Sequence, residues 1–165
     1  MDEVDRIVGA WRRERPDLDV TPLEILSRVT RLARHLDRAR SAAFARHQLE
    51  TWEFDVLAAL RRSGPPYRLS PGQLVAQTMV TSGTMTNRID RLAGRGLVRR
   101  LPDPADGRGV MVSLEDSGRA LADAALADLL RVEHDVLAVL QPGEHGRLSD
   151  LLRDLLTALE LPALP

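Results

Sequence analysis

The chain has 165 residues, a formal net charge of −1 and a hydrophobic fraction of 44%, a composition typical of a folded globular protein and not of a disordered one. It contains no cysteine, which excludes disulfides and thiolate metal sites, and its charged N-terminus does not have the layout of a signal peptide. No apolar run approaches the length of a membrane span, so we expect a cytoplasmic protein.

Charge is divided unevenly along the chain. Residues 113–165 hold ten acidic residues and four arginines, a balance of −6, whereas residues 1–112 have a balance of +5. Six arginines but only three aspartates lie between Arg88 and Arg108. A basic segment next to an acidic one predicts a polyanion site on the first part of the chain.

The first third of the chain predicts helices. Residues 3–14 have the spacing of a short amphipathic helix. The letters TPLE then predict a helix start, with Thr21 as the N-cap and Pro22 at the first helical position. This long helix is expected to run to about His47, and a further helix is expected over residues 52–62.

Two short helices joined by a tight turn are expected next. A Ser-Pro pair at 70–71 opens a helix that extends to Thr78, and a turn near Met79 leads to a second helix from about Ser82 to Gly94. The second helix carries polar and arginine residues, so the pair has the pattern of a helix-turn-helix.

A β-hairpin is expected directly after these helices. The segment GLVRRLP predicts one strand, VMVSL predicts a second, and the turn-rich letters DPADGRG join them. A hairpin in this position indicates a winged helix-turn-helix, so the expected fold class is mainly α with a small β-wing.

Two leucine-rich helices are expected after residue 115. Their apolar stripes are too extensive to face water, so we expect them to pack on a second copy of the chain together with the first helices. The alternative is packing within one chain, on the long helix. The expected organisation is N-terminal helices for dimerisation over 1–50, a winged helix-turn-helix DNA-binding domain over 51–114, and dimerisation helices over 115–165.

A helical wheel divides the helix that starts at Ser82. At 100° per residue, Met85, Ile89 and Leu92 form the inward face. Asn87 and Arg91 lie opposite and are the candidates for base edges, because asparagine pairs with adenine and arginine with guanine. Thr84 and Thr86 are candidates for phosphates or thymine methyls, and Ser82 for a phosphate at the helix start.

The run from Ser70 to Gly118 resembles the MarR family of repressors, whose D-x-x-D-x-R wing pattern is matched by Asp103, Asp106 and Arg108. The resemblance implies an obligate homodimer that binds a pseudo-palindromic double-stranded operator and is released by a small molecule. It also implies that Arg108, at the wing tip, enters a flanking minor groove.

Arg88 does not fit the DNA-reading face, because it lies about 60° from the inward face of its helix. A partly buried guanidinium needs an anionic partner, and the candidates are Asp55 or an anionic ligand. Asp55 has a simpler alternative role, as an acid in the first turn of a helix.

The segments WRRERPDLD, WEFDVL, MTNRIDRL and LVRR resemble the urate-responsive branch of the family, and the regulators of trans-aconitate methyltransferase genes. That resemblance implies an effector pocket formed by Trp11, Asp55, Arg88 and Arg100, and an anionic effector such as urate, citrate or trans-aconitate. Trp11 has the alternative role of a core anchor for the first helix. Our hypothesis is that the anion competes with Asp55 for Arg88 and displaces the DNA-reading helix.

Other classes of function receive less support. The sequence contains no nucleophile elbow, glycine-rich phosphate loop or metal-spaced cluster, so we expect neither an enzyme nor a cofactor. The remaining alternative is a constitutive DNA-binding or architectural protein that has no effector.

Overall fold

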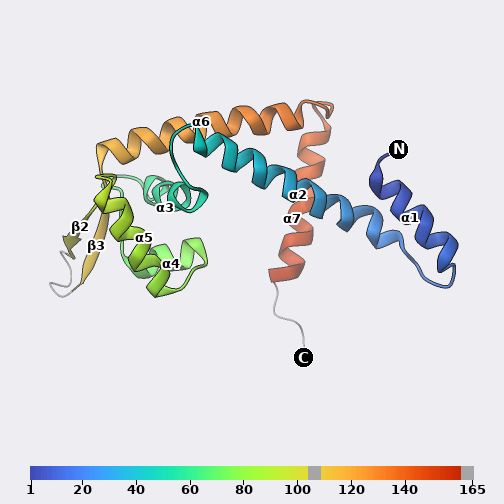
Figure 1. Ribbon diagram of the computed structural model, residues 1–165, viewed down its shortest axis with the longest axis horizontal. Helices are drawn as coiled ribbons and strands as arrows, with labels where there is room; N and C mark the ends of the chain where they lie inside the picture. The colour runs from blue at the N-terminus through green and yellow to red at the C-terminus, as the bar shows by residue number, and fades with distance from the viewer. Residues whose placement is uncertain (104–108, 161–165) are drawn as a thin grey trace. The chain divides into compact units, whose positions relative to one another are not determined.

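The computed structural model describes residues 1–103 and 109–160, which are drawn as ribbons in Figure 1. These residues divide into two compact units, one that ends at Leu129 and one that begins at Leu130. The described chain is mostly helical, with a small antiparallel sheet, as the sequence predicted. No helix in these ranges is both long enough and apolar enough to cross a membrane.

The first unit begins with an arm of two helices, α1 (Glu3–Glu14) and α2 (Thr21–Ala45). Val4 and Val8 of α1 are buried together with Val20 at the start of α2. Charge also joins the two helices, because Arg28 of α2 donates to the carboxylates of Asp2, at 2.8 Å, and Asp5, at 2.5 Å. The two aspartates lie at the N-terminus of α1, where its dipole also favours negative charge.

The predicted start of α2 is wrong by one residue. Thr21 is the first helical residue and Val20 is the N-cap, which has no side-chain hydrogen bond. The Thr21 amide instead donates to Asp19 Oδ1 at 2.9 Å. An aspartate two residues upstream satisfies this amide, so the threonine hydroxyl is not needed for the cap.

The second part of the first unit is a lobe of three helices and a sheet, built around α3 (Thr51–Arg62), α4 (Pro71–Thr78) and α5 (Ser82–Gly94). Phe44, near the end of α2, stacks on Phe54 of α3 with ring centroids 4.1 Å apart, which joins the arm to the lobe. Ser70 caps α4 by accepting from the Gln73 amide, as the Ser-Pro signal predicted.

The sheet has the strand order β1-β3-β2, with β1 (Arg68–Leu69), β2 (Val98–Pro102) and β3 (Val110–Leu114) all antiparallel. The hairpin of β2 and β3 confirms the predicted wing strands. Strand β1 was not predicted, because two residues are too few to show an alternating pattern.

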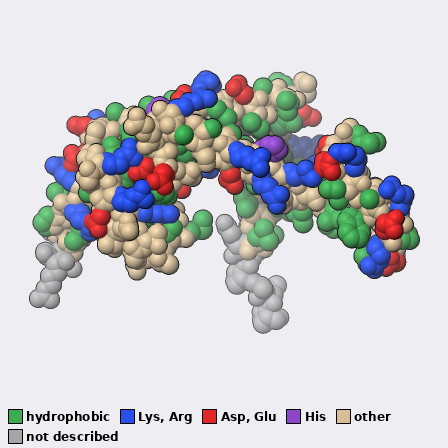
Figure 2. Space-filling model, viewed as in Figure 1, with side chains coloured by type: hydrophobic (Ala, Val, Ile, Leu, Met, Phe, Trp, Pro, Cys, Tyr) green, Lys and Arg blue, Asp and Glu red, His purple; other side chains and the backbone are tan. Residues whose placement is uncertain are grey.

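Helix α6 (Asp116–Leu137) follows β3, and α7 (Glu144–Glu160) lies in the second unit. Leu151, Leu155 and Leu156 of α7 are exposed. The arm is also apolar on its surface, and Figure 2 shows hydrophobic side chains there beside charged ones. The exposed large hydrophobic residues of α2 are Ile25, Leu26, Val29 and Leu32.

Candidate nucleic-acid interface

Helix α5 is held in the lobe by one apolar face. Met85, Ile89 and Leu92 have no exposed surface and belong to the main core, as the helical wheel predicted. The helix begins at the N-cap Thr81, whose Oγ1 accepts from the Thr84 amide at 3.3 Å. This buried face fixes the orientation of α5, so that its opposite face points away from the core of the lobe.

The outward face of α5 is polar and exposed. Ser82, Thr84, Thr86 and Asn87 all lie on this surface. Two of the hydroxyls have partners within the helix: Thr84 Oγ1 lies 2.9 Å from Thr81 Oγ1, and Thr86 Oγ1 donates to the Ser82 carbonyl at 3.1 Å. Among the described residues, the side-chain amide of Asn87 has no hydrogen-bond partner, so its NH2 donors and its carbonyl acceptor are available to a ligand.

Gly83 lies in the first turn of this face, and a Cβ added there would meet no atom within 4 Å. The packing of the chain therefore does not require a glycine at this position. A glycine weakens a helix relative to alanine, but it allows the backbone to approach a ligand closely. Alanine would therefore fit at this position, and Gly83 leaves the backbone of the first turn open to close approach by a partner.

Three arginines follow one shoulder of α5, and each contacts α3 or the loop before it. The guanidinium carbons of Arg88 and Arg91 lie 5.3 Å and 4.7 Å from the centroid of the Trp52 ring. Arg95 donates to the buried carboxylate of Glu53 at 2.7 Å and to the Gln48 carbonyl at 3.0 Å.

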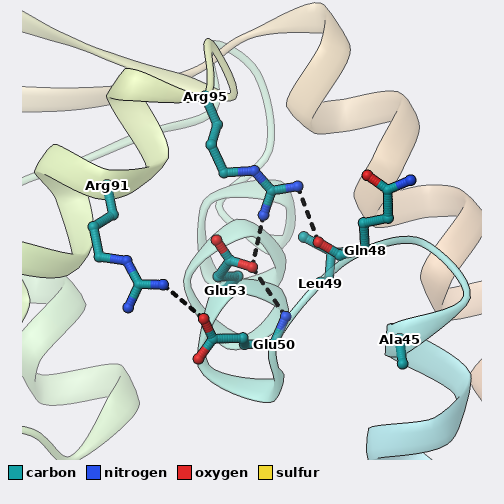
Figure 3. A pocket seen from close by; sticks show the side chains of 7 residues that line it. All are labelled: Ala45, Gln48, Leu49, Glu50, Glu53, Arg91 and Arg95. Carbon is teal, nitrogen blue, oxygen red and sulfur yellow. Dashed lines mark hydrogen bonds and ion pairs between the residues drawn. The ribbon is translucent and has the colours of Figure 1, made fainter.

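Figure 3 shows the part of this shoulder where Arg91 reaches toward Glu50 and Arg95 toward Glu53. The distance from Arg91 Nη2 to Glu50 Oε1 is 2.6 Å. These side chains border a cavity of about 480 Å³ between the start of α3 and the end of α5. Arg91, which the wheel assigned to base edges, therefore has an acidic partner within its own chain.

A second hollow, of about 490 Å³, borders the outward face itself. It is lined by Trp52, Gly83, Thr84, Asn87, Arg88 and Arg91. Three of the predicted DNA contacts, Thr84, Asn87 and Arg91, therefore share one polar surface with the start of α3.

Asp55 lies on α3, half-buried, and is surrounded by cations. Its carboxylate is 3.6 Å from Arg40 Nη2, on α2. Burial raises the pKa of Asp55, while the charges of Arg40, Arg88 and Arg62 act in the opposite direction and favour the ionised form. The expected link between Arg88 and Asp55 is thus an attraction between nearby charges, and the ion pair of Asp55 is formed with Arg40.

The chain brings only part of the expected effector pocket together. Arg100, on β2, donates to Asp90 of α5 at 2.7 Å. Asp90 lies two residues after Arg88 on α5, so the side chains of Asp90 and Arg88 point in directions roughly 160° apart around the helix. Arg100 therefore contacts α5 on a different flank from the one that carries Arg88.

Trp11 lies far from Asp55 along the arm. Its neighbour Arg12 pairs with Glu24 near the start of α2, whereas Asp55 pairs with Arg40 near the other end. Sixteen residues of helix separate these two anchor points, which corresponds to roughly 24 Å at 1.5 Å per residue. Trp11 is also half exposed, so it is not a buried anchor in this chain.

Asp106 and Arg108 of the wing pattern lie outside the described residues. Sequence reasoning missed three contributors to the interface: Glu50, Trp52 as a platform for arginines, and Thr81 as the cap of α5. The helical spacing of Trp52, Val56 and Ala59 predicts an apolar stripe, and nothing in that spacing indicates that Trp52 faces two arginines.

Comparison with known proteins agrees with this fold. Residues 47–109 match the model of the MarR family. The chain is 41% identical over 150 residues to the HTH-type transcriptional regulator PecS of Dickeya dadantii (strain 3937), a match that covers 91% of this chain and 90% of PecS.

Two solved structures are also similar. One is a cysteine-to-serine mutant of MarR from E. coli in complex with operator DNA, with a TM-score of 0.69 and 26% identity over 88% of this chain and all of that one. The other is Bordetella bronchiseptica BpsR, whose DNA binding is regulated by 6-hydroxynicotinic acid; its TM-score is 0.60, with 30% identity over 77% of this chain and 91% of that one. From its sequence and its fold, this chain belongs to the MarR family of winged helix-turn-helix, DNA-binding transcriptional regulators.

Proposed function

We propose that this chain is a ligand-responsive repressor that acts in the cytoplasm. It binds a pseudo-palindromic operator as a homodimer and is released by a small anionic metabolite. The observation that carries this proposal is the division of α5: one face is buried, one face is polar and free, and the shoulder between them carries Arg88, whose charge acts on Asp55.

The DNA-binding part rests on the outward face and on the relatives. Asn87 has free hydrogen-bonding groups, Gly83 allows close approach, and the similar MarR structure holds operator DNA. In this proposal Ser82 contacts a phosphate, Thr84 and Thr86 contact phosphates or thymine methyls, Asn87 and Arg91 read base edges, and Arg108 enters the minor groove.

The dimer is supported by apolar surface that water disfavours. Ile25, Leu26, Val29 and Leu32 of α2 are exposed, and α7 exposes a further stripe of leucines. A second copy of the chain would cover such surface. Two copies related by a twofold axis would place their α5 helices about one turn of DNA apart, which suits a pseudo-palindrome.

The effector site is proposed around Asp55 and Arg88. Three arginines, Arg40, Arg62 and Arg88, act on one half-buried carboxylate. A bound anion would supply the charge that Asp55 now supplies and draw Arg88 toward itself, and Arg88 is part of α5. Urate and tricarboxylates have suitable charge, and the DNA binding of BpsR is regulated by a small aromatic acid.

Trp11 and Arg100 are kept as proposed members of this pocket. In one chain, Arg100 is engaged by Asp90 and Trp11 lies at the far end of the arm. The complete set therefore requires Arg100 to leave Asp90, and Trp11 to be brought to the lobe by a partner copy.

The test is DNA binding by fluorescence anisotropy, on a duplex that the protein selects from a random pool. We expect salt-sensitive binding, release by urate, citrate or trans-aconitate, and a rise in melting temperature with the effective anion but not with a neutral analogue. If no anion changes either quantity, the protein is a constitutive DNA binder.

The Arg88→Ala variant tests the pocket, with Arg119→Ala of α6 as a matched exposed-arginine control. We expect Arg88→Ala to shift the midpoint of anion-induced release, and the control to leave it unchanged. If Arg88→Ala still binds the duplex and releases it at the same anion concentration, the pocket assignment is wrong.

A further inference from the structure

Glu50, the N-cap of α3, joins two residues of the α5 shoulder through one carboxylate. The indole Nε1 of Trp52 donates to Glu50 Oε2 at 2.7 Å, and Arg91 Nη2 donates to Glu50 Oε1 at 2.6 Å. The Trp52 ring in turn lies against the guanidinium of Arg91. The three residues form a closed set of contacts, which we name the Glu50 clamp.

The clamp holds Arg91 near the surface that the proposed DNA interface uses. Arg91, Asn87 and Gly83 line the same hollow, so the guanidinium lies within reach of the partner of that face. The side chains of Arg91 and Glu50 are 54% and 56% exposed. An ion pair that is exposed to this degree is weak and exchanges readily for another anion.

The neighbouring pair on the same shoulder differs in kind. Arg95 also contacts a carboxylate of α3, but its partner Glu53 is only 3% exposed. Glu53 also accepts from the Glu50 amide at 2.9 Å, so it is fixed in the structure. Separating Arg95 from Glu53 would leave a buried charge without a partner, which is costly. Of the two pairs, only the one with Glu50 is suited to opening.

We propose that Glu50 competes with DNA for Arg91. In the free protein the Glu50 carboxylate is paired with the Arg91 guanidinium, and on binding an acceptor atom of the operator replaces the carboxylate. Trp52 is a positioning residue: its indole N–H directs the carboxylate, and its ring supports the guanidinium in either state. Glu50 therefore lowers the affinity for the operator and makes that affinity less dependent on salt concentration. This inference rests on the proposed function, because it assumes that α5 contacts DNA.

The test is a double-mutant cycle of Glu50→Gln and Arg91→Ala, measured as operator affinity at several salt concentrations. We expect Glu50→Gln to tighten binding by about 2- to 5-fold for each half-site. This factor corresponds to the free energy of one exposed ion pair, which the parent protein has to break on binding and the variant does not. The dependence on salt should also become steeper, because the freed carboxylate of the parent protein takes up a cation that the variant does not. Arg91→Ala should weaken binding and flatten that dependence.

The matched control is Asp123→Asn. Asp123 of α6 pairs with Arg61 of α3 at 2.8 Å, both side chains are partly exposed, and the loss of this carboxylate changes the net charge by the same amount. We expect the gain from Glu50→Gln to exceed that of the control in the parent protein and to fall to the level of the control in the Arg91→Ala background. A second variant, Trp52→Phe, keeps an aromatic ring and removes the indole N–H. It should also tighten binding and should add nothing to Glu50→Gln.

The outcomes separate the inference from the function on which it rests. If the parent protein selects and binds no duplex, the proposed function fails. If it binds, but Glu50→Gln weakens binding, leaves it unchanged or helps equally without Arg91, then Glu50 is only a structural partner and the inference is overturned. A weakening by Trp52→Phe would contradict the positioning role in the same way.

Discussion

Gly118, in the first turn of α6, packs against the loop that follows α5. A Cβ at this position would lie 2.2 Å from the Leu97 carbonyl oxygen and 3.0 Å from Leu114 Cδ1. The Leu97 carbonyl is fixed, since it accepts from the Glu115 amide at 3.0 Å, and Ser117 Oγ donates to the adjacent Gly96 carbonyl at 2.7 Å. The backbone would have to move by about 1 Å to restore normal contact.

Gly118→Ala therefore sets two effects against each other. Alanine gains up to about 1 kcal/mol in helix propensity, whereas overpacking at a rigid site costs about 1 to 3 kcal/mol or more. Because the obstacle is a backbone carbonyl that is already hydrogen-bonded, we expect the upper part of that range and a net loss of about 2 kcal/mol. For a chain of this length, such a loss lowers the melting temperature by roughly 4 to 8 °C.

The assay is thermal unfolding followed by circular dichroism, at one fixed protein concentration because a dimer's stability depends on it. Gly94→Ala is the matched control, since Gly94 is also helical but a Cβ there would meet nothing within 4 Å. We expect the control to be neutral or slightly stabilising. A Gly118→Ala protein as stable as the parent would refute the claim that α6 is seated directly on the loop after α5.

Three further predictions concern the lobe. Gly83→Ala should raise the melting temperature, because alanine restricts the unfolded chain more than glycine does and its Cβ would meet no atom within 4 Å; a loss of stability would contradict this. The same substitution should weaken operator binding, and an unchanged affinity in the anisotropy assay would contradict that expectation. Met79→Gly should stabilise the protein by about 0.5 to 1 kcal/mol in a denaturant titration, because the Met79 backbone has a φ of 52°, which favours glycine, and the exposed side chain contributes little packing. Burial raises the pKa of Asp55 above 3.8, so the folded protein binds this proton more tightly than the unfolded chain and loses stability as pH rises through the folded pKa. Asp55→Asn should therefore melt at a higher temperature than the parent at pH 7, with a difference that shrinks as the pH falls through the folded pKa toward 3.8.

The local elements of this protein could be predicted from its sequence. The capped start of α4, the bounds of α5 and its inward face of Met85, Ile89 and Leu92 all followed from neighbouring residues. Helical periodicity and capping act over a few residues, so the information needed lies within each segment. The two strands of the wing were recognisable for the same reason.

The partners of individual charges could not be predicted in this way. Arg91 was assigned to base edges from its angle on α5, yet it meets Glu50, which is 41 residues earlier in the chain. Arg100 pairs with Asp90, and Asp55 with Arg40, although sequence spacing favoured neither pair. A wheel gives the direction of a side chain, but not what another element places in that direction.

The order of the helices, the wing hairpin and the buried face of α5 were thus available from the amino-acid sequence alone, because each depends on local periodicity. Three features emerged only once the chain was folded: β1 joins the sheet, α3 presents Glu50 and Trp52 to the arginines of α5, and Arg88 and Arg100 lie on different flanks of that helix. These features depend on how elements distant in the chain pack together, and long flexible side chains such as arginine take whichever acid that packing brings within reach.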